Sequence, residues 1–292
     1  MTALRAATAS APGKAILLGE HAVVYGHPAV AIAVDRGTRV ALQPVAGPSR
    51  ILAADIVDPR LFAAVGTLLP LQGVGATIRS DLPVGRGMGS SAALAVALVR
   101  AVALWEGRQA DLEECIRRGF EVERVFHGTP SGIDHSVSAR GGAVRYRRGP
   151  DGPELTPIRI APVPLVVLET GIAGDTARLV AGVRARRPAV DAALERIGAL
   201  VLELLPALQA GDLPTLGAGM RENQRLLRAI GVSSPEIEAL VTLADGAGAL
   251  GAKLAGAGGG GVVVALHEWP EVLLAAARDR GVPAFPVRIH EG

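Results

Sequence analysis

Cysteine, aromatic residues and lysine are all scarce in this sequence of 292 residues. A single cysteine, Cys115, excludes an internal disulfide and any metal site that needs several cysteine ligands. Aromatic residues make up 3% of the chain, so a core must be built mainly from Ala, Val, Leu and Ile. Of the 30 basic residues only Lys14 and Lys253 are lysines, which suggests that these two positions need something that arginine does not supply.

Neither the charge nor the hydropathy of the chain indicates a nucleic-acid or membrane partner. The 30 basic and 28 acidic side chains leave a formal net charge of only +2, which does not favour nucleic acid. The longest apolar stretches, near residues 92–105 and 197–208, are interrupted by Arg100 and Glu203 and fall short of the roughly 18 apolar residues of a membrane span. The first residues lack the apolar stretch of a secretory signal. We therefore expect a cytoplasmic protein with no membrane and no nucleic acid partner.

The pattern of turns and apolar residues predicts an α+β protein. With 49% hydrophobic and 20% charged residues the composition is globular, and the length suits one large or two moderate domains. Strands are predicted at residues 14–18, 29–34, 38–43, 75–81, 142–147, 164–169, 261–266 and 284–289. Helices are predicted at residues 90–105, 111–127, 188–208, 213–229, 235–249 and 270–280. The Pro- and Gly-rich segment 147–164 indicates a boundary, and we place the two domains at residues 1–156 and 157–292.

Three segments are rich in glycine or carry glycines at close spacing, and they lie at residues 12–21, 82–93 and 253–261. In the second, Gly85, Gly87 and Gly89 permit positive φ and close backbone approach. Ser90 and Ser91 then open a predicted helix, whose free N–H groups and positive dipole end form an anion site. A serine hydroxyl there can also bind Mg²⁺. A tight turn before a serine-capped helix would look the same, so this segment alone leaves both interpretations open.

The third segment formally matches the dinucleotide-binding pattern G-x-G-x-x-G at Gly256, Gly258 and Gly261. That pattern requires a helix to follow, whereas the residues after Gly261 predict a strand. No glycine-rich run ends in Gly-Lys-Ser/Thr, which excludes the Walker phosphate loop. A flexible connection between strands is the plainer interpretation, but so many glycines are costly to order.

In this order and spacing, the three segments resemble the motifs of the GHMP kinases, the superfamily of galactokinase, homoserine kinase, mevalonate kinase and phosphomevalonate kinase. The motif P-x-x-x-G-x-G-S-S-A-A, here Pro83 to Ala93, is specific to that superfamily. The chain is most similar to the mevalonate kinase branch, and the similar stretches are residues 11–29, 123–146, 170–184 and 253–263. The resemblance implies an N-terminal nucleotide-binding α+β domain, a ferredoxin-like C-terminal domain and an active site in the cleft between them.

The resemblance also implies a catalytic pair. Asp134, in the sequence Gly132-Ile133-Asp134, matches the catalytic base of the family, and Lys14 matches its active-site lysine. A carboxylate can accept the proton of the attacking hydroxyl, and an ammonium can stabilise the developing charge. The alternatives are a loop carboxylate that caps nearby N–H groups and a solvated lysine at the start of a strand.

ATP and Mg²⁺ are the cofactors that the resemblance implies. The residues that match the nucleotide-binding loop are Pro83, Gly85, Gly87, Met88, Gly89, Ser90, Ser91 and Ala92. Ser91 and Glu123 match the Mg²⁺ ligands, and a hard cation that keeps several waters needs few protein oxygens. An exposed helix acid is the alternative for Glu123, because Glu121 lies on the same predicted helix.

The implied substrate is a small alcohol. Residues that match the substrate side of the family are Lys14, Glu20, His21, Asp134, Thr176 and Gly258. The segment 172–176 lacks the arginine that animal enzymes of this family carry just before the threonine. Prokaryotic relatives often lack this arginine too. Lys253 is expected only to anchor the third segment.

The implied activity is ATP-dependent phosphorylation of the primary hydroxyl of mevalonate, which gives 5-phosphomevalonate and ADP in isoprenoid biosynthesis. One alternative is another GHMP kinase that acts on phosphomevalonate, a sugar or homoserine, because the phosphate and Mg²⁺ elements are shared and acceptor pockets are not. A second alternative is a catalytically inactive ligand-binding regulator on the same scaffold. Dimers are common in the family, so a homodimer is considered as well.

Overall fold

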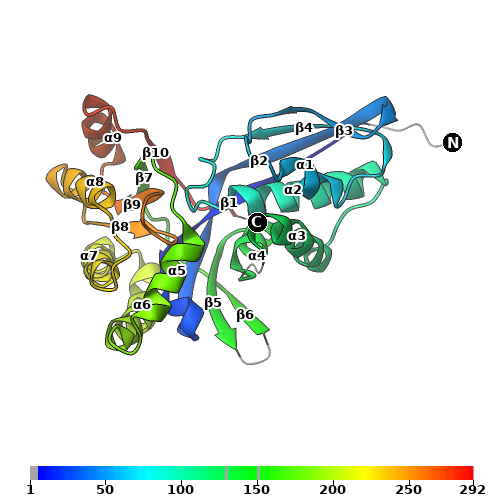
Figure 1. Ribbon diagram of the computed structural model, residues 1–292. Helices are drawn as coiled ribbons and strands as arrows, with labels where there is room; N and C mark the ends of the chain where they lie inside the picture. The colour runs from blue at the N-terminus through cyan, green and yellow to red at the C-terminus, as the bar shows by residue number, and fades with distance from the viewer. Residues whose placement is uncertain (1–5, 129–130, 150–151, 292) are drawn as a thin grey trace.

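Two β-sheets with helices packed against them make up the molecule, which confirms the expected α+β class (Figure 1). The computed structural model describes residues 6–128, 131–149 and 152–291. In the first sheet the strand order is β3-β4-β2-β5-β6, and β1 pairs with β2 outside this path. The strands are β1 (Ala7–Leu18), β2 (Ala29–Pro48), β3 (Arg50–Ala54), β4 (Gln72–Ser80), β5 (Ala143–Gly149) and β6 (Gly152–Ile158).

Helix α2 lies at the centre of the first half of the molecule. The helices of this half are η1 (Ala22–Tyr25), α1 (Leu61–Gly66), α2 (Ser90–Trp105), α3 (Leu112–His127) and α4 (Ile133–Arg140). Helix α2 packs against β1, β2, α3 and α4. All residues from 92 to 99 are fully buried, which explains why Ala, Leu and Val occupy every face of this helix.

The second sheet is antiparallel throughout and has the order β10-β7-β9-β8. Its strands are β7 (Leu165–Glu169), β8 (Gly251–Ala255), β9 (Val262–Leu266) and β10 (Ala284–Val287). The helices of this half are α5 (Thr176–Ala185), α6 (Asp191–Ala210), α7 (Leu213–Ala229), α8 (Pro235–Gly246) and α9 (Pro270–Asp279). Helices α7, α8 and α9 pack against this sheet, and in Figure 1 they lie on its side away from the first sheet. Helix α6 packs against α7 and contacts η1, β1 and β2 of the first half. The strand order is that of the expected ferredoxin-like domain.

Strand β1 pairs with β2 along one edge only. Among residues 6–128, 131–149 and 152–291 no strand pairs with its other edge, and other parts of the chain cap that edge. The capping bonds run from Arg100 to the carbonyl oxygen of Ser10 at 2.9 Å, from Ser138 to that of Pro12 at 2.6 Å, from the amide of Lys14 to the carbonyl of Met88 at 3.0 Å, and from Lys253 to the carbonyl of Ile16 at 3.3 Å. An open strand edge is a template for unwanted pairing. Because these bonds cap the edge, α2, α4, the loop before α2 and the second sheet all contact β1.

The structure differs from the predicted elements in several places. The two strands predicted at 29–34 and 38–43 are one strand, β2, because residues 35–37 continue the strand where its neighbour changes from β5 to β4. The elements that were not predicted are η1, α1, β3, α4, β6, α5 and β8. Most of these are short, so they carry too few residues for a periodic pattern to stand out.

The change from the first sheet to the second occurs between β6 and β7. Strand β6 pairs with β5 up to Ile158, so the domain boundary expected after residue 156 falls just inside this strand. The end of the chain returns to the first sheet, where Ile289 forms a bridge with Val34 and the amide of His290 donates to the carbonyl of Ala33 at 2.9 Å. The two halves are therefore joined by the C-terminal residues as well as by the linker.

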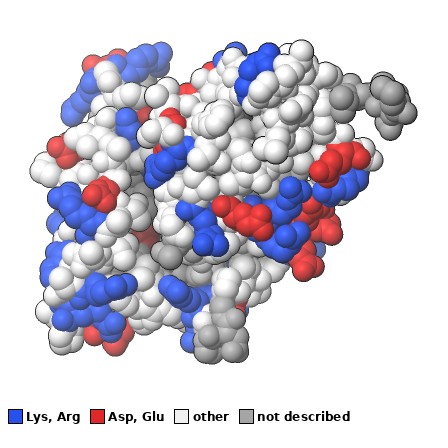
Figure 2. All heavy atoms as spheres, turned by 45° about the vertical axis from the view of Figure 1, so that its right-hand side comes forward, with Lys and Arg blue, Asp and Glu red and all other residues white. Residues whose placement is uncertain are grey.

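Basic and acidic side chains are interspersed on the molecular face drawn in Figure 2. Among the residues that the structure describes, no helix is both long and apolar enough to cross a membrane.

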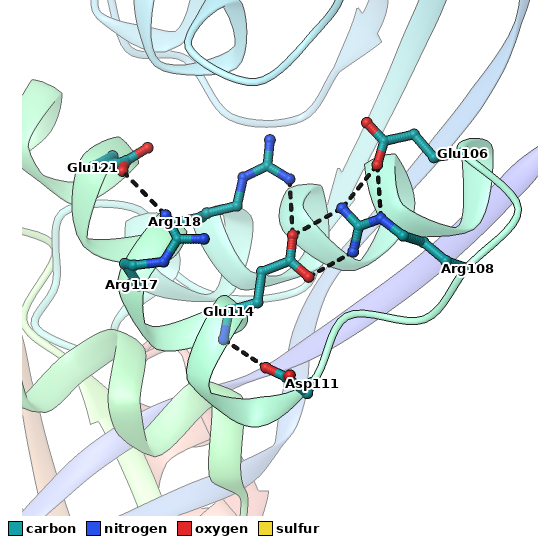
Figure 3. A network of polar contacts seen from close by, with 7 residues as sticks. All are labelled: Glu106, Arg108, Asp111, Glu114, Arg117, Arg118 and Glu121. Atoms are coloured by element: carbon teal, nitrogen blue, oxygen red, sulfur yellow. Dashed lines mark hydrogen bonds and ion pairs between the residues drawn. The ribbon is translucent and has the colours of Figure 1, made fainter.

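A network of charged side chains joins the start of α3 to the loop that follows α2 (Figure 3). Glu114 accepts two hydrogen bonds from Arg108, at 2.5 and 2.8 Å, and one from Arg118 at 3.0 Å. Arg108 also donates to Glu106 at 2.9 Å. The Asp111 side chain accepts from the amide of Glu114 at 2.7 Å and so caps the helix. The bonds from Arg108 hold the pKa of Glu114 at about 2, below its ordinary value of 4.5.

We predict that Glu114→Gln lowers the free energy of unfolding by about 1 kcal/mol at pH 7, as expected for a half-exposed network. The pKa of Glu114 is lowered in the folded state, so its pairing stabilises the fold above pH 4.5 and is lost as the pH falls through about 2. Urea unfolding at several pH values measures this. Glu113→Gln, in the same helical turn, is the matched control for the helix dipole. Equal effects of both substitutions at pH 7 would contradict the prediction.

Candidate active site

Lys14 and Asp134 meet beside the second glycine-rich segment. The Lys14 ammonium lies 3.2 Å from an Asp134 carboxylate oxygen and donates to the carbonyl of Gly87 at 3.1 Å. The Lys14 side chain is 4% exposed and that of Asp134 is 32% exposed, so the carboxylate is open to a ligand while the ammonium is held. A Cβ atom at Gly89 would lie 2.9 Å from the Lys14 side chain. Glycine at this position therefore makes room for the lysine.

Asp134 is the second residue of α4, so the alternative of a carboxylate in a loop does not apply. The helix begins after Gly132, whose φ of 91° is in the left-handed region that glycine adopts most easily. Asp134 thus stands in the first turn, where the helix dipole favours a negative charge.

Glu123 is a buried carboxylate with an oxygen that has no partner. It lies on α3, is 1% exposed, and its Oε1 atom accepts no hydrogen bond from the described residues. Burial, with the nearby charge of Asp134, raises the pKa of Glu123 to about 7, and a hydrogen bond with Ser91 opposes the shift. A second hydrogen bond joins the Ser91 hydroxyl to Nε2 of His127 at 3.2 Å, a contact that sequence analysis did not find.

These oxygens fit a divalent cation. A bound cation would give the unpartnered Glu123 oxygen a partner and would return the pKa of this carboxyl toward its usual range. In the described part of the chain, no group of three or more His, Cys, Asp or Glu side chains could hold a metal ion. A cation bound at Glu123 and Ser91 must therefore take further ligands from water or phosphate, as Mg²⁺ commonly does.

The second glycine-rich segment turns directly into α2, as predicted. Gly85, Gly87 and Gly89 have φ values of 70°, 83° and 70°, and α2 begins at Ser90. The predicted nucleotide-binding residues, which form this continuous turn, are Pro83, Gly85, Gly87, Met88, Gly89, Ser90, Ser91 and Ala92. Met88 and Ala92 have buried side chains, so they can contribute only main-chain groups. The N–H groups at the start of α2 give the turn an anion-binding end.

The third glycine-rich segment packs tightly between neighbouring loops. Gly256 and the four glycines from 258 to 261 all have positive φ. A Cβ at Gly258 would lie 2.1 Å from the carbonyl oxygen of Val232, and one at Gly174 would lie 2.4 Å from that of Gly258. Strand β9 follows directly, which agrees with rejecting the dinucleotide interpretation. Thr176, the first residue of α5, is exposed, and Asp175 caps that helix.

His21 and Glu20 lie where β1 ends, and they contact the second half of the molecule. Nε2 of His21 lies 2.8 Å from the carbonyl oxygen of Ala257, and burial lowers the pKa of this histidine. The Glu20 carboxylate forms a fully buried ion pair with Lys253 and accepts from Asn223 at 3.1 Å. Both oxygens of the Glu20 carboxylate therefore have partners within the protein.

Lys253 and Asn223 therefore belong to the surroundings of the site, although sequence analysis gave Lys253 only a loop-anchoring role. Each is rare in composition, since the chain has two lysines and a single asparagine. Their rarity was the one signal in the sequence that these residues have a specific role. The sequence could not show their shared partner Glu20, because it lies more than 200 residues away from each.

Comparison with known proteins defines the class. The family description "GHMP kinases N terminal domain" matches residues 53–142, and "GHMP kinases C terminal" matches residues 204–280. These matches lie in the two halves that carry the site, and the chain belongs to the GHMP kinases.

Within that class the chain belongs to the mevalonate kinase family. It is 39% identical to the mevalonate kinase of Pyrococcus horikoshii over 97% of this chain and 96% of the relative. It is 36% identical to that of Thermococcus sibiricus, with the same coverage. Among solved structures, L. major mevalonate kinase in complex with R-mevalonate matches with a TM-score of 0.87 and 28% identity, over 98% of this chain and 96% of that one.

We predict that Glu123 makes the cation-free protein less stable as the pH rises. The folded state holds this proton up to about pH 7, whereas the unfolded chain releases it near 4.5. The free energy of unfolding should therefore fall between these pH values, by up to about 3 kcal/mol. Chemical unfolding in the presence of a chelator measures this, and Glu123→Gln should remove the slope. Glu121→Gln, on the exposed side of α3, is the control that keeps it.

Mg²⁺ should in turn stabilise the wild-type protein more at pH 8 than at pH 6, because the cation competes with the proton for Glu123. Parallel pH profiles for the wild type and Glu123→Gln would contradict both statements.

Proposed function

We infer that the protein transfers the γ-phosphoryl group of ATP to the primary hydroxyl of mevalonate, giving 5-phosphomevalonate and ADP. This is a step of isoprenoid biosynthesis. The observation that carries the proposal is the Lys14–Asp134 pair, which lies at the glycine-rich turn with one partner held and the other open. Membership of the mevalonate kinase family over nearly the whole chain supports the acceptor.

The proposed roles of Lys14 and Asp134 follow from the demands of phosphoryl transfer. Such a reaction is accelerated mainly by positioning and by stabilising charge. Asp134 would accept the proton of the attacking hydroxyl or hold that hydroxyl in line. Lys14, fixed by the carbonyl of Gly87, would stabilise the negative charge that develops on the hydroxyl oxygen and the γ-phosphate.

The turn from Pro83 into α2 is proposed to hold the phosphates of ATP. Its glycines let the phosphates approach the main chain, and the N–H groups at Ser90 and Ser91 can donate to them. Glu123 and Ser91 would hold Mg²⁺, which when bound supplies neutralisation of phosphate charge.

The acceptor is proposed to lie between the two halves of the molecule. His21 comes from the first half, and Thr176 and Gly258 come from neighbouring loops of the second. His21, with its pKa lowered by burial, would be neutral near pH 7. Its Nε2 donates to the carbonyl of Ala257, so Nδ1 could accept a hydrogen bond from a hydroxyl of the acceptor. Glu20 would act only through its neighbours.

The first test is ADP release from MgATP with separate additions of mevalonate, phosphomevalonate, galactose and homoserine. Turnover with mevalonate alone is expected. Turnover with another acceptor would support the kinase activity and contradict mevalonate as the substrate. Nucleotide binding without turnover for any acceptor would favour the ligand-binding regulator.

Asp134→Asn should reduce kcat by about 10² to 10⁴-fold, because the amide cannot accept the proton. Nucleotide affinity should stay near the wild-type value, since Asp134 is not part of the phosphate-binding turn. Steady-state kinetics and nucleotide titration measure the two quantities. Asp279→Asn, on the exposed end of α9, is the control and should keep full activity. Wild-type turnover of Asp134→Asn would reject Asp134 as the base.

A further inference from the structure

Lys253 is a fully buried cation whose contacts cross from the second sheet to the first. Its side chain is 0% exposed, as is that of its partner Glu20. The ammonium donates to one Glu20 oxygen and to the carbonyl oxygen of Ile16, the latter at 3.3 Å. The other Glu20 oxygen accepts from Nδ2 of Asn223 on α7 at 3.1 Å. Strand β8 and helix α7 thus contact the end of β1 through one cluster, formed by Lys253, Glu20 and Asn223.

The two residues that Lys253 contacts lie in sequence between the candidate site residues Lys14 and His21. Ile16 follows Lys14 by two residues on β1, and Glu20 directly precedes His21. His21 closes the segment with its own bond to the carbonyl oxygen of Ala257, four residues beyond Lys253. Residues 14–21 are therefore attached to the third glycine-rich segment at three points.

The backbone of His21 has a conformation that non-glycine residues rarely adopt. Its φ of 59° and ψ of −46° make it the only non-glycine residue with positive φ in the described parts of the chain. Such a conformation is costly and persists only where surrounding contacts impose it. Main-chain bonds of the turn hold His21 locally, from the amide of Ala22 to the carbonyl of Glu20 at 2.6 Å and from the amide of Val24 to the carbonyl of His21 at 3.1 Å. The Glu20–Lys253 pair and the His21–Ala257 bond attach this turn to the second half of the molecule.

An ammonium suits this site and a guanidinium does not. The contacts of Lys253 are a carboxylate oxygen and one carbonyl, which a compact group with three donors can serve. A guanidinium brings five donors in a planar fork, and a site with no exposure offers no water to satisfy them. This accounts for a lysine here in a chain whose basic residues are otherwise arginine at all positions except Lys14.

We propose that Lys253 is a positioning residue, which sets Lys14 and His21 relative to the third glycine-rich segment across the two halves of the molecule. The proposal rests on the proposed function, since it assigns Lys14 to the phosphoryl group and His21 to the acceptor. Lys253 itself touches neither ATP nor the acceptor. It acts by fixing the main chain on both sides of the residues that do.

The test uses the double variant Lys253→Met/Glu20→Gln. Lys253→Met alone would leave the Glu20 carboxylate buried without its cation, which destabilises the fold itself. The double variant removes both charges and keeps the side-chain volumes. We expect it to fold with a wild-type circular dichroism spectrum and to bind MgATP with an unchanged Kd. We expect kcat to fall and KM for mevalonate to rise, so that kcat/KM drops by about 10- to 100-fold, because small misplacements of reacting groups have effects of this size.

The matched control is Arg196→Met/Glu222→Gln. It removes a half-exposed ion pair of 2.8 Å between α6 and α7, next to Asn223 in sequence, by the same two kinds of substitution. Arg196→Met also removes the contact of Arg196 with Glu203 within α6. This control should keep the wild-type kcat and KM. A folded Lys253→Met/Glu20→Gln variant with wild-type kcat and KM would overturn the proposal. Loss of nucleotide affinity in parallel with turnover would also overturn it, because the change would then have reached the phosphate-binding turn, to which Lys253 makes no hydrogen bond.

The NMR signals of the His21 ring separate failure of this proposal from failure of the proposed function. They are assigned by comparison with a His21→Gln sample and require no substrate. If Lys253 positions His21, the ring signals shift in the double variant and stay unchanged in the control. Unchanged ring signals in the double variant would overturn the proposal whichever acceptor the wild type uses. A wild type that turns over another acceptor would leave the ring test valid and reject only the mevalonate assignment.

Discussion

The unpaired edge of β1 is the constraint on which the arrangement of the site depends. Main-chain groups that face away from β2 need hydrogen-bond partners, and a sheet edge left open invites association. The partners come from α2, α4, the loop before α2 and β8. Two of these bonds lie at Lys14 and Ile16, and α4 carries Asp134. The contacts that cap this edge therefore also bring Lys14 and Asp134 together.

Two buried ionisable groups near this edge, Lys253 and Glu123, differ in whether the protein supplies their hydrogen-bond partners. Lys253 has a carboxylate partner, a carbonyl partner and no exposure, so its charge is fully compensated inside the protein. Glu123 has an oxygen without a partner and a pKa raised to about 7. A buried charge that the protein leaves uncompensated is typical of a place where a ligand completes the contacts. The contrast separates Lys253, which is paired within the protein, from Glu123, for which we propose a cation as the missing partner.

The sequence predicted those features of the fold that depend on local chemistry. Helix α2 was placed to the residue, because serines follow a glycine-rich turn and a long Ala/Leu/Val run follows the serines. Helix α4 was missed, because it has eight residues and begins at a left-handed glycine instead of a capping side chain. Asp35–Gly37 read as a turn but continue β2 between two neighbouring strands. The Glu20–Lys253 pair was missed because only the folded chain brings residues 233 positions apart together.

The arrangement divides phosphoryl transfer from acceptor selection. Lys14, Asp134, Glu123 and the turn into α2 all belong to the first half, and in the proposed function they act on groups that every substrate of such a kinase shares. Apart from His21, the residues proposed to contact the acceptor, Thr176 and Gly258, belong to the second half. Under that proposal, acceptor preference can change through the second half without disturbing the charges that drive the reaction. This division requires the two halves to keep a fixed relation, and buried contacts that cross between them, such as those of Lys253, are the means of keeping it.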